Sequence, residues 1–293
     1  HMTIGFQHPT AKAAMLAIAL VVVPGTASAQ PTAPYYERSF VLAADARCDL
    51  FRPDVVAALS AATQQARSAA LRAGTSEAEV RAAADRALSR ARSVSCADPQ
   101  LATVRQRVEH AFAGWARMPR MEFPGVRASW IANRLPAAGA SWILTQASVT
   151  GASPVTLGYT AGEVGNRLTA VVSFVGRPRP YAARIVMRDP GRSPRAWLGG
   201  ASDLPPTSVR RGFWAVSFGD ADPALLVTGK SAGEAWRFPG EAAQALEQLD
   251  PREAFAIEFL FRDDSVALAT FEAGDFAAGR AFLSLGPLGG LAA

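Results

Sequence analysis

The sequence has little histidine. Two of its three histidines, His1 and His8, come before an apolar run near the N-terminus, so His110 is the only imidazole in the rest of the chain. This excludes histidine-rich metal sites and any mechanism that needs two imidazoles. His110 lies in a helical pattern beside Glu109, and no Gly-x-Ser-x-Gly nucleophile motif accompanies it. We therefore expect His110 to be dispensable, and we assign no catalytic residue.

The sequence also lacks an apolar run long enough to span a bilayer. Residues 13–23 are apolar, but a resident transmembrane helix needs roughly 20 such residues. Lys12 precedes this short run, and Ala27-Ser28-Ala29 follow it, which is the pattern of a secretory signal peptide. We predict a signal peptide over residues 1–29, with His1 as a cloning scar, and no transmembrane segment in the mature chain. The predicted location is periplasmic or secreted.

Cysteine is scarce too, since the chain has only Cys48 and Cys96. Cys48 comes just before one predicted helix, and Cys96 comes just after the next one. In an antiparallel helical hairpin these two ends are neighbours, so an oxidising compartment would join the thiols. A loop of this length is worth about 4 kcal/mol in the chain-entropy model. The sequence therefore predicts a structural disulfide rather than a metal site or a redox Cys-x-x-Cys.

Lysine is almost absent, and arginine supplies nearly all of the positive charge. Arginines outnumber acidic residues before residue 195, and acidic residues outnumber cationic ones after it. The densest run of arginines after residue 125 contains Asp189 as its only acidic residue. Because side chains alternate between the two faces of a strand, Arg184 and Arg188 would lie on one face. This run is either a solvated basic face or a docking site for carboxylates or phosphates. Its members are Arg177, Arg179, Arg184, Arg188, Arg192 and Arg195.

The chain divides into a helical part and a β-rich part. Residues 30–46 form a proline-containing leader without strong periodicity. Residues 47–125 show three amphipathic helices, with helix starts at Pro53, at Ser76 with Glu79, and at Asp98. Residues 126–293 change to short runs rich in β-branched and aromatic residues. We predict strands in that part at 127–133, 141–149, 155–160, 167–175, 181–188, 209–218, 224–229, 254–262 and 265–272.

The predicted fold class is therefore α+β. A disulfide-stapled N-terminal helical module precedes an antiparallel β-sandwich or half-barrel. Two short C-terminal helices, at residues 240–249 and 275–283, complete this part of the fold.

The six tryptophans permit two interpretations. Exposed tryptophans stack on sugar rings in carbohydrate-binding proteins, whereas buried ones fill β cores and module interfaces. Their spacing does not separate these alternatives. No calcium loop, phosphate-binding loop or spaced pair of carboxylates stands out, so we expect no cofactor, no metal and no nucleic-acid partner.

Residues 242–283 resemble the C-terminal part of secreted proteins of the invasion-associated locus B family. The shared pattern is a helix with Ala245-Leu246, a strand with Ile257-Glu258-Phe259, a second strand, and a closing helix that begins after Gly274-Asp275. The resemblance covers about 40 residues and implies a small extracytoplasmic β-sandwich without known enzymatic machinery. Members of that family carry cysteines in the β domain, and this chain has none there.

Taken together, these features indicate a non-enzymatic extracytoplasmic protein that binds a ligand or interacts with the cell envelope. The expected partner is an anionic envelope component or an acidic protein. The main alternative is a hydrolase of the cell wall or another polymer with unrecognised catalytic residues. A structural oligomer subunit is the third interpretation, and the oligomeric state is left open.

Overall fold

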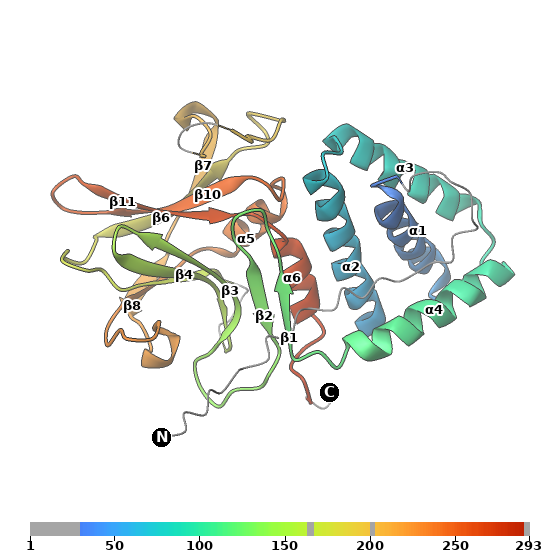
Figure 1. Ribbon diagram of the computed structural model, residues 1–293, viewed down its shortest axis with the longest axis horizontal. Helices are drawn as coiled ribbons and strands as arrows, with labels where there is room; N and C mark the ends of the chain where they lie inside the picture. The colour runs from blue at the N-terminus through green and yellow to red at the C-terminus, as the bar shows by residue number, and fades with distance from the viewer. Residues whose placement is uncertain (1–29, 163–166, 200–202, 290–293) are drawn as a thin grey trace, which may run out of the picture.

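The computed structural model describes residues 30–162, 167–199 and 203–289, and the predicted signal peptide lies outside them. The fold is α+β, as predicted, with a helical module beside an antiparallel β-sandwich (Figure 1). The helical module contains α1 (Ala33–Cys48), α2 (Pro53–Arg72), α3 (Glu77–Ser93) and α4 (Pro99–Trp115).

Helix α1 corrects the prediction of an irregular leader over residues 30–46. It buries only Phe40, Val41 and Ala44, so its apolar stripe is too narrow to stand out in the sequence. Contacts with α3 and α2 stabilise it, and the Arg90 guanidinium lies 4.4 Å from the Phe40 ring centroid. Tertiary packing therefore stabilises α1, whose own sequence pattern does not predict a helix.

The predicted disulfide between Cys48 and Cys96 is present, with the two Cα atoms 5.5 Å apart. It links the end of α1 to the loop between α3 and α4. Beside it, the Arg47 guanidinium donates to the carbonyl of Val94 at 3.0 Å, at the C-terminal end of α3. The helix starts at Pro53, at Ser76 with its Glu79 capping box, and at Asp98 also match the sequence pattern.

Two antiparallel sheets form the sandwich. The seven-stranded sheet has the order β1-β2-β3-β4-β5-β9-β8, and the four-stranded sheet has the order β11-β10-β6-β7. The strands are β1 (Arg120–Phe123), β2 (Trp130–Asn133), β3 (Trp142–Thr150), β4 (Ser153–Thr160), β5 (Thr169–Val172), β6 (Ala182–Arg188), β7 (Arg210–Trp214), β8 (Ser217–Asp220), β9 (Glu234–Arg237), β10 (Ala254–Leu260) and β11 (Val266–Glu272).

The strand predictions fail in four places. The single strand predicted at 209–218 is divided into β7 and β8, which belong to different sheets. The first strand already begins at Arg120, before the expected domain boundary at residue 126. The predicted strand at 224–229 is wrong, because Asp222 caps a short 3₁₀ turn over Pro223–Leu225. The adjacent strand β9 was missed, since it has only four residues, and pairing with β5 and β8 defines it.

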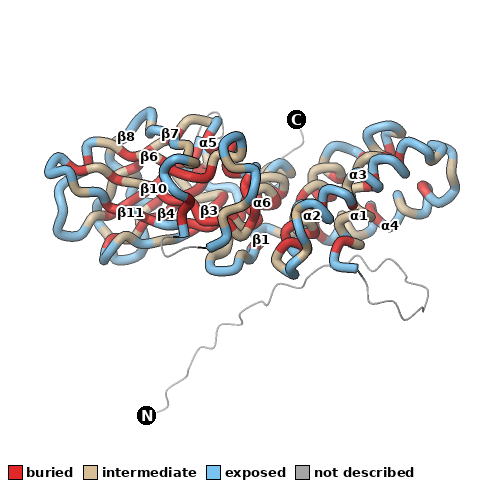
Figure 2. Tube along the Cα trace, turned by 90° about the horizontal axis from the view of Figure 1, so that it is seen from above, coloured by how far each residue is buried: buried red, intermediate tan, exposed pale blue. Residues whose placement is uncertain are grey.

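Buried residues gather between the two sheets (Figure 2), and large aromatic side chains fill this core. At one side, the chain passes from β7 directly into β8, so one segment forms the edge of both sheets. At the other side, the Gln146 side-chain amide of β3 bonds the backbone of Glu272 on β11 in both directions, at 2.9 and 2.7 Å. The interior is therefore filled and closed along both sides.

Two short helices, α5 (Gly240–Glu247) and α6 (Phe276–Leu283), complete the β-rich part, as predicted. Helix α6 lies between α2 and strands β1 and β2 (Figure 1). Arg72 at the end of α2 makes two hydrogen bonds, at 3.1 and 3.3 Å, to the buried carboxylate of Asp275 just before α6. Burial raises the pKa of Asp275, although Arg72 opposes that shift.

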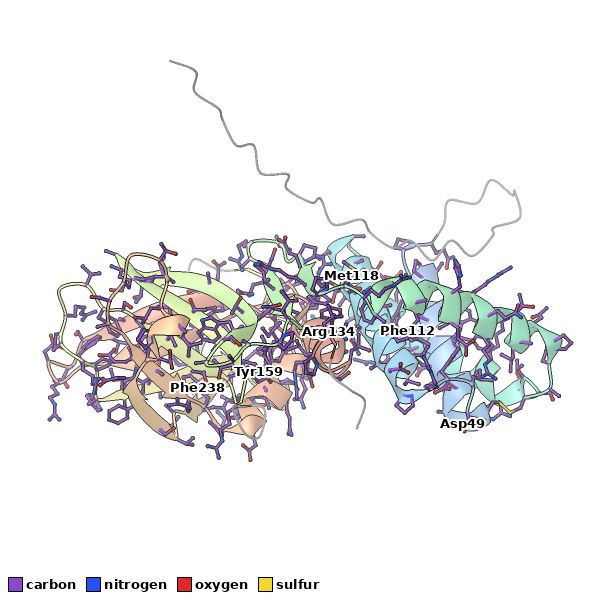
Figure 3. The ribbon with its side chains drawn as sticks, turned by 90° about the horizontal axis from the view of Figure 1, so that it is seen from below. Asp49, Phe112, Met118, Arg134, Tyr159 and Phe238 are labelled. Atoms are coloured by element: carbon purple, nitrogen blue, oxygen red, sulfur yellow. A yellow bond between two sulfur atoms is a disulfide. The ribbon has the colours of Figure 1, made fainter. Side chains whose placement is uncertain are left out.

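A second arginine holds the junction where the chain leaves the helical module. Arg134, after β2, is buried near Met118 (Figure 3). Its guanidinium donates to the carbonyls of Ala116 and Gly286, at 3.0 and 2.7 Å. These carbonyls follow the C-terminal ends of α4 and α6, where helix dipoles favour a cation. The two parts of the chain thus share a continuous interface.

Candidate binding surface

The fold separates the six arginines of the predicted docking stretch. Arg177 and Arg179 lie in the connection between β5 and β6. Their guanidinium groups lie 4.0 Å from the Phe261 ring centroid and 5.9 Å from that of Phe218. Arg179 also pairs with Glu234, at 3.3 Å, and with Asp220. These two arginines therefore contact the aromatic side chains of the sandwich itself.

Arg188 is buried rather than displayed. It forms a bidentate pair with Glu253, with Nη2 2.8 Å from Oε2, and it donates to the carbonyl of Ser193 at 2.6 Å. Glu253 also accepts from the backbone N–H groups of Trp197 and Asp250. Burial lowers the pKa of Arg188, but the bonds and charge of Glu253 outweigh it, so the net shift is upward. The pair is therefore satisfied within the fold.

The last two arginines lie in the loop that follows β6. Arg192 is exposed and lies 3.4 Å from Asp189. Arg195 is also exposed. Within the part of the chain that the structure describes, four of the six arginines thus have a carboxylate partner, namely Arg179, Arg184, Arg188 and Arg192.

Arg184 lies in a different environment on the outer face of the four-stranded sheet. Its Nε lies 2.5 Å from Oε2 of Glu258 on β10, and its guanidinium lies 5.0 Å from the Trp214 ring centroid on β7. The register places Leu268, Glu258, Arg184 and Trp214 in one row across the four strands. One charged pair is thus flanked by an apolar side chain on each side.

Half of this outer face is covered, and half is not. Leu204, in the loop after β6, packs on Val186 and Ala256 and covers one half. In the other half Trp214 is 50% exposed, Val266 52% and Leu268 39%. We call this second half the uncovered face, and it consists of Arg184, Trp214, Glu258, Leu260, Val266 and Leu268.

The structure separates the two interpretations of the tryptophans. Trp130 and Trp236 are fully buried, and Trp115 is nearly so. Trp142 and Trp197 are partly buried. Of the six tryptophans, which all lie within the described residues, only Trp214 is exposed. The tryptophans therefore mostly build the fold, while Trp214 is available to a ligand.

Sequence reasoning missed the role of β11 in this surface, although a pattern for it was present. Solvated strands usually alternate apolar and polar residues, whereas a strand covered on both faces is apolar throughout. Residues 266–271 read Val-Ala-Leu-Ala-Thr-Phe, so both faces of β11 are largely apolar. That pattern indicates an apolar outer face, and the structure leaves it uncovered.

Two hollows lie away from the uncovered face. One, about 570 Å³, is lined by Arg52, Val55, Glu109, Phe112 and Ala113 between α2 and α4. The other, about 20 Å³, lies where α2 meets the β-rich part and includes Asp275. Neither hollow is lined by a tryptophan. His110 is exposed on α4 and does not line either hollow.

Within the described residues, no group of three or more His, Cys, Asp or Glu side chains is placed to hold a metal ion. No described helix combines the length and apolarity needed to cross a membrane. Comparisons with family models, curated proteins and solved structures found no match to this chain. The resemblance to the invasion-associated locus B family remains a prediction.

Proposed function

We propose that this chain is a non-enzymatic binding protein of the periplasm or the secreted fraction, and that it interacts with a component of the cell envelope through its uncovered face. The observation that carries the proposal is the exposure of Trp214, Val266 and Leu268 on the outer face of the four-stranded sheet. Exposed apolar side chains gathered on one face of a sheet are characteristic of interaction sites.

The contrast within the sheet supports this proposal. In one half of the outer face, Leu204 of the loop after β6 packs on Val186 and Ala256. Trp214 and Leu268 occupy opposite edge strands of the same row. A partner that contacts both would therefore cover the full width of the sheet.

The arginines support a smaller electrostatic contribution than the sequence indicated. Glu253 and Glu258 neutralise Arg188 and Arg184, and Arg192 lies against Asp189. An anionic envelope component or an acidic protein would meet mostly paired charges here. The apolar surface around Trp214 therefore carries the proposed binding, and the exposed Arg195 lies outside that surface.

The disulfide supports the proposed location, because disulfides persist in oxidising compartments such as the periplasm. The predicted signal peptide is the second support. Both are independent of the uncovered face, so the location and the binding surface can be tested separately.

The test compares the chain with a Trp214→Ala, Leu268→Ala variant, both produced in the periplasm. We expect the parent to cosediment with isolated cell envelopes and the variant to be released. Leu88→Ala, which alters an exposed leucine of α3, is the matched control and should bind as the parent does. Equal binding of the parent and the double variant would show that the uncovered face does not bind the envelope.

A further inference from the structure

The uncovered face is not uniformly apolar. In its central row, Glu258 and Arg184 stand between Leu268 and Trp214. The Arg184 side chain is 39% exposed, and that of Glu258 is 13% exposed. Any partner that covers this row must therefore accommodate an ion pair together with an aromatic ring.

We propose that the ligand of this face is an uncharged glycan strand of the cell wall, which lies across the four strands with one sugar ring against Trp214. The inference rests on the proposed function and names the ligand class of the same surface. A sugar ring offers an apolar face to an indole and hydroxyl groups to neighbouring charged side chains, which is the combination that this row presents.

Hydrogen-bonding capacity is available at the correct place. Arg184 uses Nε to reach Glu258, and its two terminal nitrogens make no hydrogen bond within the described residues. A guanidinium carries five N–H donors, so most of those of Arg184 remain free for ligand hydroxyls. On Glu258, Oε1 lies 3.9 Å from Arg210, beyond hydrogen-bonding distance, and can accept from a hydroxyl.

An apolar or lipid partner fits this row less well. It would remove the Arg184–Glu258 pair from water without replacing its hydration, and buried ion pairs carry a large desolvation cost. A polyanion also fits less well, because the carboxylate of Glu258, which lies against both Arg184 and Arg210, places negative charge in the middle of the face. Glycan hydroxyls both donate and accept, so they hydrate both members of the pair.

The dimensions of the surface agree with a short oligosaccharide. Neighbouring strands lie about 4.8 Å apart, so the row from Leu268 to Trp214 spans about 14 Å, the length of a few sugar units. Gly212 precedes Trp214 by two residues on the same face and is exposed. Gly212 therefore places no side chain beside Trp214 on this face.

Gly212 also provides a variant that adds bulk instead of removing a contact. A Cβ built on Gly212 meets its nearest atom at 3.5 Å, an ordinary van der Waals distance. Gly212→Thr should therefore fold, since threonine suits a strand, while its side chain occupies the space beside Trp214.

The experiment measures binding of the disulfide-bonded chain to protein-free peptidoglycan sacculi and to a soluble β-1,4-linked N-acetylglucosamine hexamer. We expect binding to both probes. Trp214→Ala should weaken it at least tenfold and Gly212→Thr several-fold, while Leu88→Ala should leave it unchanged. Raising salt from 0.1 to 1 M should change the affinity less than twofold, because stacking is not screened by ions.

The other outcomes overturn the inference in distinguishable ways. The chain could bind only the protein fraction of envelopes and lose that binding in Trp214→Ala. This result would support the proposed function but reject a glycan as the ligand. Binding to lipopolysaccharide that disappears at high salt points to phosphate recognition and also rejects it. Self-association lost in Trp214→Ala identifies the face as a subunit interface. Absence of any envelope binding rejects both proposals.

Discussion

Each half of the outer face of the four-stranded sheet contains one arginine–glutamate ion pair, and the two pairs differ in how far they are exposed to solvent. Arg188 and Arg184 lie four residues apart on one face of β6, and each pairs with a glutamate of the same sheet region. The Arg188 side chain is 4% exposed under its loop, whereas that of Arg184 is 39% exposed. Coverage by the loop after β6 therefore makes one pair structural and leaves the other accessible.

The comparison shows that a dense run of arginines is not by itself a binding site. What each arginine does depends on which carboxylate reaches it and on what covers it. The four predictions that follow test this difference, and they are arranged from the largest expected loss of stability to the smallest.

Arg188→Met should cause the largest loss. It leaves the carboxylate of Glu253 buried without its cation, and breaking a buried pair costs about 3–5 kcal/mol. Urea unfolding of the disulfide-bonded chain measures the change. Adding Glu253→Gln to Arg188→Met should recover part of it, because the uncompensated charge is then gone. A loss under about 1 kcal/mol in the single variant would show that the covered half does not depend on this pair.

Leu204→Ala should weaken the packing of the loop after β6 on Val186 and Ala256. Truncation of a buried leucine typically costs about 2–5 kcal/mol, and a loop position belongs at the lower end of that range. Amide hydrogen exchange should also become faster at Val186 and Ala256, which Leu204 covers. Leu268→Ala on the uncovered face is the control, with an expected change under about 0.5 kcal/mol. Equal losses at the two leucines would contradict the division of the face.

Asp250 makes the stability of the covered half depend on pH. Burial raises its pKa, but the Arg252 side chain and backbone N–H more than offset this, and the net pKa is lowered. A lowered folded pKa means that this carboxylate stabilises the fold above its unfolded pKa of about 3.9 and that the contribution is lost as pH falls through the folded value.

The measurement is the free energy of unfolding of the parent and Asp250→Asn from pH 7 down to pH 3. The parent should lose more stability than the variant over the acidic end of this range, so the two curves should converge. Curves that remain parallel would show that Asp250 does not titrate with folding.

Arg184→Gln should have the smallest effect on stability. A solvent-accessible ion pair is worth about 1 kcal/mol or less, and the contact with Trp214 adds about 0.5–1 kcal/mol at an exposed site. A double-mutant cycle with Trp214→Ala isolates that contact. A loss as large as that of Arg188→Met would mean that the uncovered pair is also structural, and it would weaken the proposed binding surface.

Much of the architecture could be predicted from local patterns. Ser76 with Glu79 and Asp98 mark helix starts by satisfying free N–H groups in the first turn, which needs no tertiary information. The disulfide was predicted from the position of Cys48 just before one helix and of Cys96 just after the next, and in the structure Cys48 ends α1, which packs on α3. The change from helical to alternating periodicity placed the β-rich part correctly in outline.

The missed elements share one physical cause, which is that distant segments define them. Helix α1 depends on packing against α3, and β9 depends on pairing with β5 and β8. The short turn at Asp222 replaced a predicted strand because a local side-chain cap competes with strand pairing.

The sequence by itself determined the α+β fold class, the helices that begin at Pro53, Ser76 and Asp98, the disulfide, and the positions of the arginines and tryptophans, since these depend on periodicity, caps and composition. Only the tertiary structure decided which arginine is buried and which tryptophan is exposed. The partners of Arg184 and Arg188 are Glu258 and Glu253, 74 and 65 residues further along the chain. Leu204 comes from a loop whose path local patterns do not specify. Contacts of that sequence separation depend on how the whole chain packs, and they set the chemical character of each residue here.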